Sequence, residues 1–125
     1  MNDAVKPVLI VGNWKMYKTI EESTDFIHEL LPLVKESTDL IYLAVPFTLI
    51  KTMADEAKDS PIVIGAQNMN DAEEGAFTGE IAGRMLKDAG AKFVILGHAE
   101  RRRVFLETDE FINKKLKRAL IDGLQ

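Results

Sequence analysis

Ionisable side chains gather directly after the apolar run Phe93–Leu96. The segment from Gly97 to Arg102, GHAERR, places a histidine, a glutamate and two arginines within five residues. Burying so many titratable groups at the end of a strand costs free energy unless a site uses them. If a helical turn begins at Ala99, its amino terminus disfavours the imidazolium form of His98. We therefore expect a neutral His98 that donates a hydrogen bond at neutral pH.

A second polar group follows the first apolar run of the chain. Residues 12–15, GNWK, come directly after Val8–Val11. In a βα barrel, the carboxyl ends of the strands carry the chemistry. Lys15 would therefore bring an ammonium group to the mouth of the sheet, where it suits a phosphate or a developing oxyanion. The alternative is a solvated lysine in a surface loop.

The histidines and Glu100 also have plain structural alternatives. His98 could be a hydrogen-bonded structural residue at a strand end, and Glu100 could be an ion-pair partner of a neighbouring arginine. What favours a site is their position at the same end of the expected sheet as Lys15. His28 lies among acidic residues in a helical segment, and we interpret it as a surface residue.

Four short apolar runs indicate the strands that would position these groups. The runs are continuous rather than alternating and rich in β-branched residues, which is typical of parallel strands buried on both faces. They are Val8–Val11, Leu40–Val45, Ile62–Ile64 and Phe93–Leu96.

The segments between these runs have the spacing of amphipathic helices. The first helix should begin at Thr19, which can form a capping box with Glu22, and Pro32 should kink or shorten it. The later helices are expected over residues 49–58, over residues 80–89, and from Thr108 or Asp109 onward, with Gly90 ending the third. Apolar stripes are predicted at Ile20, Phe26, Ile27, Leu30, Leu31 and Val34 of the first helix and at Phe111, Leu116, Ala119, Leu120 and Leu124 of the fourth.

This order predicts an α/β architecture of four βα units in a single domain over residues 1–125. Parallel strands with right-handed crossovers form either an open doubly wound sheet or part of a barrel, and periodicity does not separate the two. No GxGxxG or GxxxxGK[ST] loop occurs, so nothing indicates a nucleotide site.

A long loop is predicted after the third strand, between residues 65–68 (GAQN) and 75–80 (GAFTGE). Loops of this length inside a compact domain usually have a function. Phe77 would be exposed at the tip, which predicts a surface that covers it. The alternative is a flexible glycine-rich loop that its acidic residues keep soluble.

Composition narrows the class of protein. The net charge is −4 and no basic block is concentrated, so we expect no nucleic-acid partner. No run approaches the roughly 18 apolar residues of a membrane span, and residues 1–6 lack the pattern of a signal peptide. There is no cysteine, which fits a reducing compartment, and we expect a cytoplasmic location.

Taken together and in order, the four motifs at residues 12–16, 65–68, 75–80 and 95–102 resemble the triosephosphate isomerase family. The resemblance covers essentially the whole chain and matches the amino-terminal half of that family. It implies half of a (β/α)8 TIM barrel and the interconversion of dihydroxyacetone phosphate and glyceraldehyde 3-phosphate through an enediolate. It implies no cofactor and no metal.

The resemblance also implies roles for single residues. Asn13 and Lys15 would bind the triose phosphate substrate, with Lys15 facing its oxyanion. His98 would polarise the carbonyl and move protons between the two enediolate oxygens, with Glu100 supporting Lys15. The neutral imidazole in this role is the established description of the family and not a result of the sequence reasoning.

By the same resemblance, the loop after the third strand belongs to a dimer interface. Thr78 would lie at the tip that enters a neighbouring subunit, with Phe77 and Gln67 at the same contact. A homo-oligomer is therefore expected.

The sequence departs from the family in two positions and in extent. Ala99 and Ala82 stand where the family has serine. The general base, the flexible lid and the glycine-rich phosphate loops would all follow Gln125, so we expect the 125 residues alone to be inactive without a complementary carboxyl-terminal half.

Two alternatives to an enzyme follow from the same residues. One is a self-associating half-barrel that acts as a structural or assembly module. The other is a binding module with weak affinity for phosphorylated or anionic ligands through Lys15 and His98.

Overall fold

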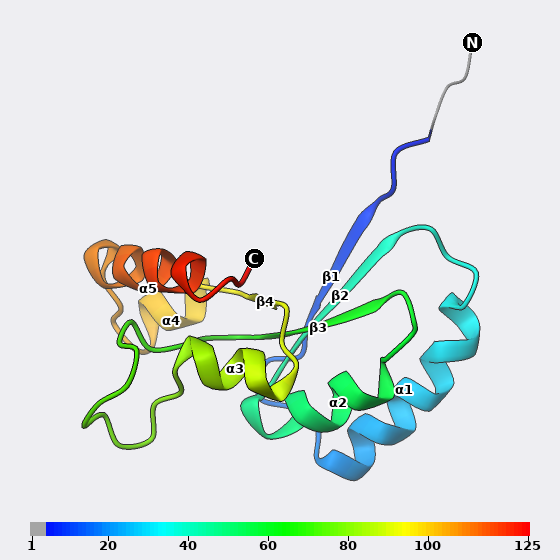
Figure 1. Ribbon diagram of the computed structural model, residues 1–125, viewed down its shortest axis with the longest axis horizontal. Helices are drawn as coiled ribbons and strands as arrows, with labels where there is room; N and C mark the ends of the chain where they lie inside the picture. Colours follow the sequence, from blue (N-terminus) through cyan, green and yellow to red (C-terminus); the bar gives the residue numbers. More distant parts are fainter. Residues whose placement is uncertain (1–4) are drawn as a thin grey trace.

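The computed structural model describes residues 5–125, so the expectation about residues 1–6 rests partly on residues 1–4, which lie outside the described part. Strands and helices alternate along the chain (Figure 1). In order, the elements are β1 (Leu9–Asn13), α1 (Ile20–Val34), β2 (Leu40–Val45), η1 (Phe47–Leu49), α2 (Ile50–Glu56), β3 (Ile62–Ala66), α3 (Gly83–Ala89), β4 (Phe93–Val94), α4 (Ala99–Arg103) and α5 (Asp109–Ile121).

The strands form one parallel sheet in the order β1-β2-β3-β4. Leu9 pairs with Leu40, Ile41 pairs with Ile62, and Gly65 pairs with Phe93, so each strand lies beside the next one along the chain. An open doubly wound sheet reverses its strand order at a switch point, and this sheet does not. The predicted four βα units are confirmed, and the sheet is half of a barrel.

Only one face of the sheet is well covered. On β2 and β3, core residues such as Ile41 and Ile62 alternate with partly exposed ones such as Leu40 and Val63. Ile10 of β1 is 53% exposed, and its neighbours in the strand are similar. The prediction that the strands are buried on both faces is therefore wrong, because the helices pack against one face and β1 has a neighbour on one side only.

The fourth strand ends earlier than predicted, at Val94 rather than Leu96. The end of the chain lies beside it: Gln125 N donates to Lys92 O at 3.1 Å, and Val94 N donates to Gln125 O at 3.0 Å. This is the hydrogen-bond pattern of a parallel bridge. The edge of the sheet at β4 is therefore already partly paired.

The local signals for helix ends are confirmed in α1 and partly in α3. Thr19 caps α1 and forms the predicted capping box with Glu22, and the helix ends at Val34, just after Pro32. Helix α3 ends at Gly90 (φ 107°) as predicted, but it begins at Gly83 rather than residue 80. The preceding segment stays extended because Asn70 N donates to Ile81 O at 2.8 Å.

The remaining helices also differ in detail from the prediction. A short 3₁₀ turn, η1, precedes α2, which ends at Glu56. Thr108 caps α5, as expected. The predicted stripe of α5 is partly wrong, because Leu116 and Leu120 are exposed while Lys115 is 1% exposed.

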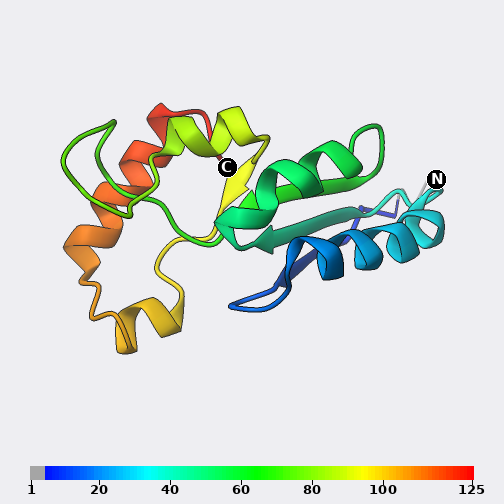
Figure 2. The same cartoon turned by 90° about the horizontal axis from the view of Figure 1, so that it is seen from below.

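The two ends of the molecule differ in their helices. Helix α1 runs alongside β1 and β2, while α4 and α5 lie together at the opposite end (Figures 1 and 2). The buried core joins them, from Ile27 of α1 through Ile64 of β3 to Ala119 of α5. Within residues 5–125, no helix is long and apolar enough to cross a membrane.

Candidate active site

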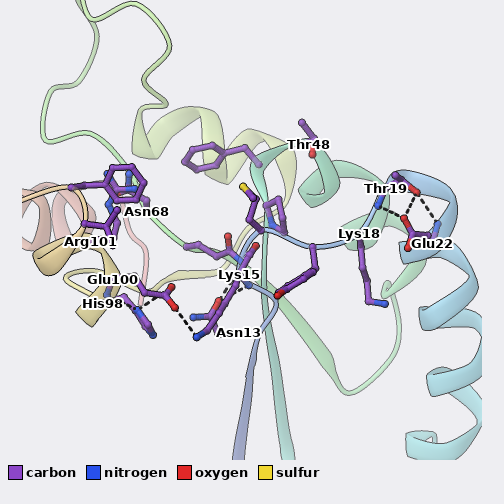
Figure 3. A pocket seen from close by; sticks show the side chains of 17 residues that line it. Asn13, Lys15, Lys18, Thr19, Glu22, Thr48, Asn68, His98, Glu100 and Arg101 are labelled. Atoms are coloured by element: carbon purple, nitrogen blue, oxygen red, sulfur yellow. Dashed lines mark hydrogen bonds and ion pairs between the residues drawn. The ribbon is translucent and has the colours of Figure 1, made fainter.

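A hollow of about 920 Å³ lies at the carboxyl ends of the strands. Three segments bring polar groups to it. Lys15 comes from the turn after β1 and His98 from the start of α4 (Figure 3), and Gln67 directly follows β3. Sequence reasoning placed Lys15 and His98 at one mouth of the sheet, but it assigned Gln67 to a contact with a neighbouring subunit. The residues that line the hollow are Asn13, Lys15, Met16, Tyr17, Lys18, Thr19, Glu22, Pro46, Phe47, Thr48, Gln67, Asn68, His98, Glu100, Arg101, Val104 and Phe105.

The backbone of Lys15 has a left-handed conformation, with φ of 55°. A non-glycine residue adopts this conformation at a cost, and surrounding contacts must hold it. Lys15 N donates to Asn13 Oδ1 at 2.9 Å, and Lys15 O accepts from Gln67 Nε2 at 3.0 Å. Both polar groups of the Lys15 backbone therefore have side-chain partners.

Gln67 ties three strand ends together. Besides Lys15 O, its Nε2 lies 3.2 Å from Asn13 Oδ1 and 3.0 Å from Ala44 O at the end of β2. An amide NH₂ has two protons, so these three acceptors share them. The side chain is directed into its own chain, towards Asn13 and Lys15, and its contact with a neighbouring subunit stays a prediction.

The side chain of Lys15 is held by Glu100. Lys15 Nζ lies 2.7 Å from Glu100 Oε1, and both side chains are half-exposed. The hydrogen bond from Lys15 is the main cause that holds the pKa of Glu100 below its ordinary value, against a smaller opposing effect of burial. Glu100 is therefore a carboxylate at neutral pH, and its ionic partner is Lys15 rather than a neighbouring arginine.

His98 caps the first turn of α4, as the sequence suggested. Glu100 N donates to His98 Nδ1 at 3.2 Å, and the nearer carboxylate oxygen, Glu100 Oε2, lies 3.5 Å from the same nitrogen. A nitrogen that accepts a backbone hydrogen bond carries a lone pair, so the neutral ring holds its proton on Nε2. That N–H is the group that His98 can present to a ligand in the hollow.

Arg101 and Arg102 of α4 make their contacts outside the pair formed by Lys15 and Glu100. Arg101 Nε donates to Glu107 Oε2 at 2.6 Å, and Arg102 Nε donates to Gly97 O at 3.0 Å. Arg102 also forms an ion pair with Asp109 at the start of α5. These contacts fix α4 against the segment that follows it.

Sequence reasoning missed a buried ionic cluster behind the site. Lys115 Nζ, on α5, lies 2.7 Å from Glu107 Oε2 and 2.9 Å from Asn68 Oδ1. Burial raises the pKa of Glu107, but hydrogen bonds from Lys115 and Arg101 outweigh it and hold the pKa below its ordinary value. The other carboxylate oxygen, Glu107 Oε1, is buried and has no hydrogen-bond partner among residues 5–125. The available signal was spacing: Lys115 lies four residues from both Phe111 and Ala119 on one helical stripe.

The loop after β3 does not reach the hollow with its tip. Phe77 is 52% exposed, as predicted, and it lines a separate small depression with Gly75 and Glu80 rather than the site. Thr78 is exposed. Residues 5–125 leave both side chains exposed, and their place in a subunit contact stays a prediction. His28 lies at the surface and pairs with Glu56 at 2.8 Å.

Comparisons with known proteins decide the family. The sequence model described as triosephosphate isomerase matches residues 8–125. The chain belongs to the triosephosphate isomerase family. A curated triosephosphate isomerase of Protochlamydia amoebophila (strain UWE25) is 56% identical over 124 residues, which are 99% of this chain and 47% of that protein. The triosephosphate isomerase of Clostridium botulinum (strain ATCC 19397 / Type A) is 45% identical over 120 residues, 96% of this chain and 48% of that protein.

The solved structures agree with the sequence relatives. The crystal structure of triosephosphate isomerase from Bartonella henselae superposes with a TM-score of 0.87 at 35% identity, covering 96% of this chain and 49% of that one. The chain spans about half the length of the triosephosphate isomerases it matches. The predicted family and the predicted half-barrel are both confirmed.

Proposed function

We propose that residues 1–125 act as one half-barrel unit that supplies the electrophilic half of a triosephosphate isomerase active site. The observation that carries this proposal is the arrangement around Glu100. Its carboxylate holds the Lys15 ammonium at 2.7 Å, and its backbone N–H donates to His98 Nδ1 at 3.2 Å, so a neutral His98 ring would carry its donor at Nε2. The substrate would be dihydroxyacetone phosphate or glyceraldehyde 3-phosphate.

Each group has a role in forming the enediolate. Charge develops on the substrate oxygen as the carbon-bound proton leaves, and a fixed ammonium stabilises that charge mainly in the transition state. His98 Nε2–H would donate to the carbonyl oxygen and then move the proton between the two oxygens. Asn13 would bind the substrate beside Lys15. No metal or cofactor is needed for these steps.

The base that removes the carbon-bound proton is assigned to a complementary carboxyl-terminal half. By family resemblance, the base, the lid and the phosphate loops follow Gln125. Glu100 is bound to Lys15 and lies on a different loop from the one expected for a base. General base catalysis typically contributes about 10²–10⁴-fold, so the 125 residues alone should show no turnover above buffer.

The test is to combine the two halves. Residues 1–125 would be mixed with, or fused to, the carboxyl-terminal half of the Protochlamydia relative, and isomerisation of glyceraldehyde 3-phosphate would be measured. Turnover should appear only in the combination, and Lys15→Ala should abolish it, whereas the surface variant Lys51→Ala should leave it unchanged. Lys15-dependent turnover by the isolated chain would show that our assignment of the base is wrong.

A second candidate function is a self-associating half-barrel. It is favoured by the exposed apolar strand β1 and by the exposed loop tip at Phe77 and Thr78. Homo-oligomer formation would bury both. A self-associating module requires no isomerase turnover. A solution mass above that of the monomer, without turnover in the combined halves, would therefore favour this second function over the first. We place either activity in the cytoplasm, which the absence of cysteine supports.

A further inference from the structure

We propose that the buried Lys115 is a positioning residue that holds Lys15 in place through Asn68 and Gln67. The proposal rests on the role proposed above for Lys15. Of the two residues that Lys115 hydrogen-bonds, Asn68 lines the hollow, so Lys115 would act through the loop after β3 and not on a substrate.

The burial of Lys115 calls for a reason beyond stability. Its side chain is 1% exposed and that of Glu107 is 4% exposed. Taking two charges out of water costs free energy that their attraction often only balances, and well-packed apolar side chains of similar volume can replace such pairs at no loss. What an apolar side chain cannot supply is the hydrogen bond from Nζ to Asn68 Oδ1 at 2.9 Å.

Asn68 and Gln67 connect the buried Lys115 to Lys15. They are consecutive residues at the end of β3, and Asn68 accepts from Lys115 in the core while Gln67 donates to Lys15 O at 3.0 Å. If the hydrogen bond between Lys115 and Asn68 is lost, the backbone that carries Gln67 is no longer held in place, and the Gln67 amide can move. The left-handed backbone of Lys15 then loses one of its two holding contacts.

A second route runs from the same buried carboxylate to Lys15. Glu107 Oε2 accepts from Arg101 as well as from Lys115, and Arg101 follows Glu100, whose carboxylate binds Lys15 Nζ. Arg101 and Asn68 both line the hollow, on the side of His98 and Glu100 (Figure 3). The two routes both start at Glu107 and end at Lys15. One would fix the position of the Lys15 backbone, and the other would fix the position of its ammonium group.

A merely structural role for Lys115 predicts something different. Its loss would lower stability and leave the geometry at Lys15 unchanged in molecules that stay folded. The titration of Glu100 separates the two cases, because the hydrogen bond from Lys15 is the main cause of the lowered pKa of Glu100. His98 and Arg103 also act on Glu100, and neither is changed in the variants below.

The experiment is a carbon-detected NMR titration of the Glu100 carboxyl in the 125-residue chain. The decisive variant is Asn68→Ala, which leaves the buried ion pair and the net charge intact. We expect an upward shift of the Glu100 pKa towards its ordinary value in Asn68→Ala and in Lys115→Met. A folded Asn68→Ala chain in which Glu100 titrates as in the wild type would overturn the proposal.

Two controls exclude simpler causes of a shift. Lys117→Met removes an exposed positive charge from the same helix, so it measures the effect of charge alone. Met53→Ala removes a fully buried side chain from the other end of the core, so it measures the effect of lost stability. Neither should move the Glu100 pKa as far as Asn68→Ala, and an equal shift in Met53→Ala would overturn the proposal.

Turnover gives an independent reading in the combined enzyme. A displacement of about 1 Å at a catalytic group can cost on the order of 100-fold in rate, so Asn68→Ala should lower kcat/KM by about 10- to 100-fold. If the combined wild-type enzyme shows no turnover, the proposed function fails, while the Glu100 titration still decides the positioning role.

Discussion

Lys15 and Glu100 are 85 residues apart in the sequence, and Lys15 Nζ lies 2.7 Å from Glu100 Oε1. Lys15 follows β1 and Glu100 follows β4, the first and last strands of a sheet in which these two strands are not neighbours. Their side chains meet because the sheet curves and brings the ends of its outer strands together. Curvature of the half-barrel thus assembles the site before any further strand is added.

Loss of the Glu100 carboxylate should make Lys15 more reactive. An ammonium that donates to a carboxylate must give up that hydrogen bond before its amine can attack a reagent. In Glu100→Gln we therefore expect faster acylation of Lys15, followed by mass spectrometry, with the exposed Lys114 as the internal reference. Equal labelling of Lys15 in both proteins would show that the contact is not populated in solution.

The stability of the chain should depend on pH through Glu107. Its pKa is lowered in the folded state, so it contributes stability above its ordinary pKa of about 4.5, and that stability is lost as the pH falls below this value. The difference in unfolding free energy between wild type and Glu107→Gln should be largest near neutral pH and should shrink in acid. Urea unfolding at a series of pH values measures it. A difference that stays constant with pH would contradict the assignment.

Breaking the buried pair on one side should cost more than replacing both partners. Lys115→Met removes one of the two cations that bind the buried Glu107 carboxylate and leaves Arg101 as its partner. Complete loss of the partner of a buried charge typically costs about 3–5 kcal/mol, so we expect a loss of up to that size. The double variant Lys115→Met/Glu107→Leu removes both charges and should recover part of that loss. Urea midpoints of the single and double variants test this order, and Lys117→Met should unfold like the wild type. A double variant less stable than Lys115→Met would refute it.

Sequence reasoning grouped several candidate residues at one end of the sheet because the signals for them are local. Strand ends followed by polar motifs identified Lys15 and His98, and the capping residues Thr19 and Thr108 were read directly from their own side chains. Parallel strands place their carboxyl ends at one edge, so these motifs had to lie near one another. Residue types and chain order were sufficient for this part.

Other features could not be predicted because their causes are distant in the chain. Lys115 reads as a polar interruption of an apolar stripe, and its contacts with Glu107 and with Asn68, 47 residues away, explain its burial. Strand β1 reads as doubly buried, yet its exposure depends on which neighbours are present.

The absence of a side chain at Gly65 leaves room for the ring of Phe93, so a larger residue should not fit at this position. A Cβ at this position would lie 2.4 Å from the ring atoms of Phe93. Overpacking of this kind typically costs about 1–3 kcal/mol, so Gly65→Ala should be destabilised, and adding Phe93→Leu should relieve the clash. Phe93→Leu should lower the free energy of unfolding in the wild-type background and raise it in the Gly65→Ala background. Thermal or urea unfolding of the single and double variants measures this difference. Additive losses in the double variant would mean that the strand shifts instead.

Self-association should depend more on β1 than on the loop tip. The β4 edge is partly paired by Gln125, whereas Ile10 and its neighbours in β1 are about half exposed and apolar. Unpaired apolar edges promote association, and a charge on the edge opposes it. Ile10→Lys should therefore weaken association strongly, measured by sedimentation at micromolar concentration.

The substitution Phe77→Asp tests whether the loop tip contributes to self-association. The loop tip needs a receiving hollow in a second molecule, and burying a carboxylate there is unfavourable, so this variant should weaken association if the loop docks. Because the wild-type chain has a mass of 14.0 kDa, the monomer is easily resolved from its dimer. Equal association constants for Phe77→Asp and the wild type would assign the contact to β1 alone. A wild-type chain that sediments as a folded monomer would contradict both predictions. Both surfaces would then stay exposed in solution, and neither would be a site of self-association.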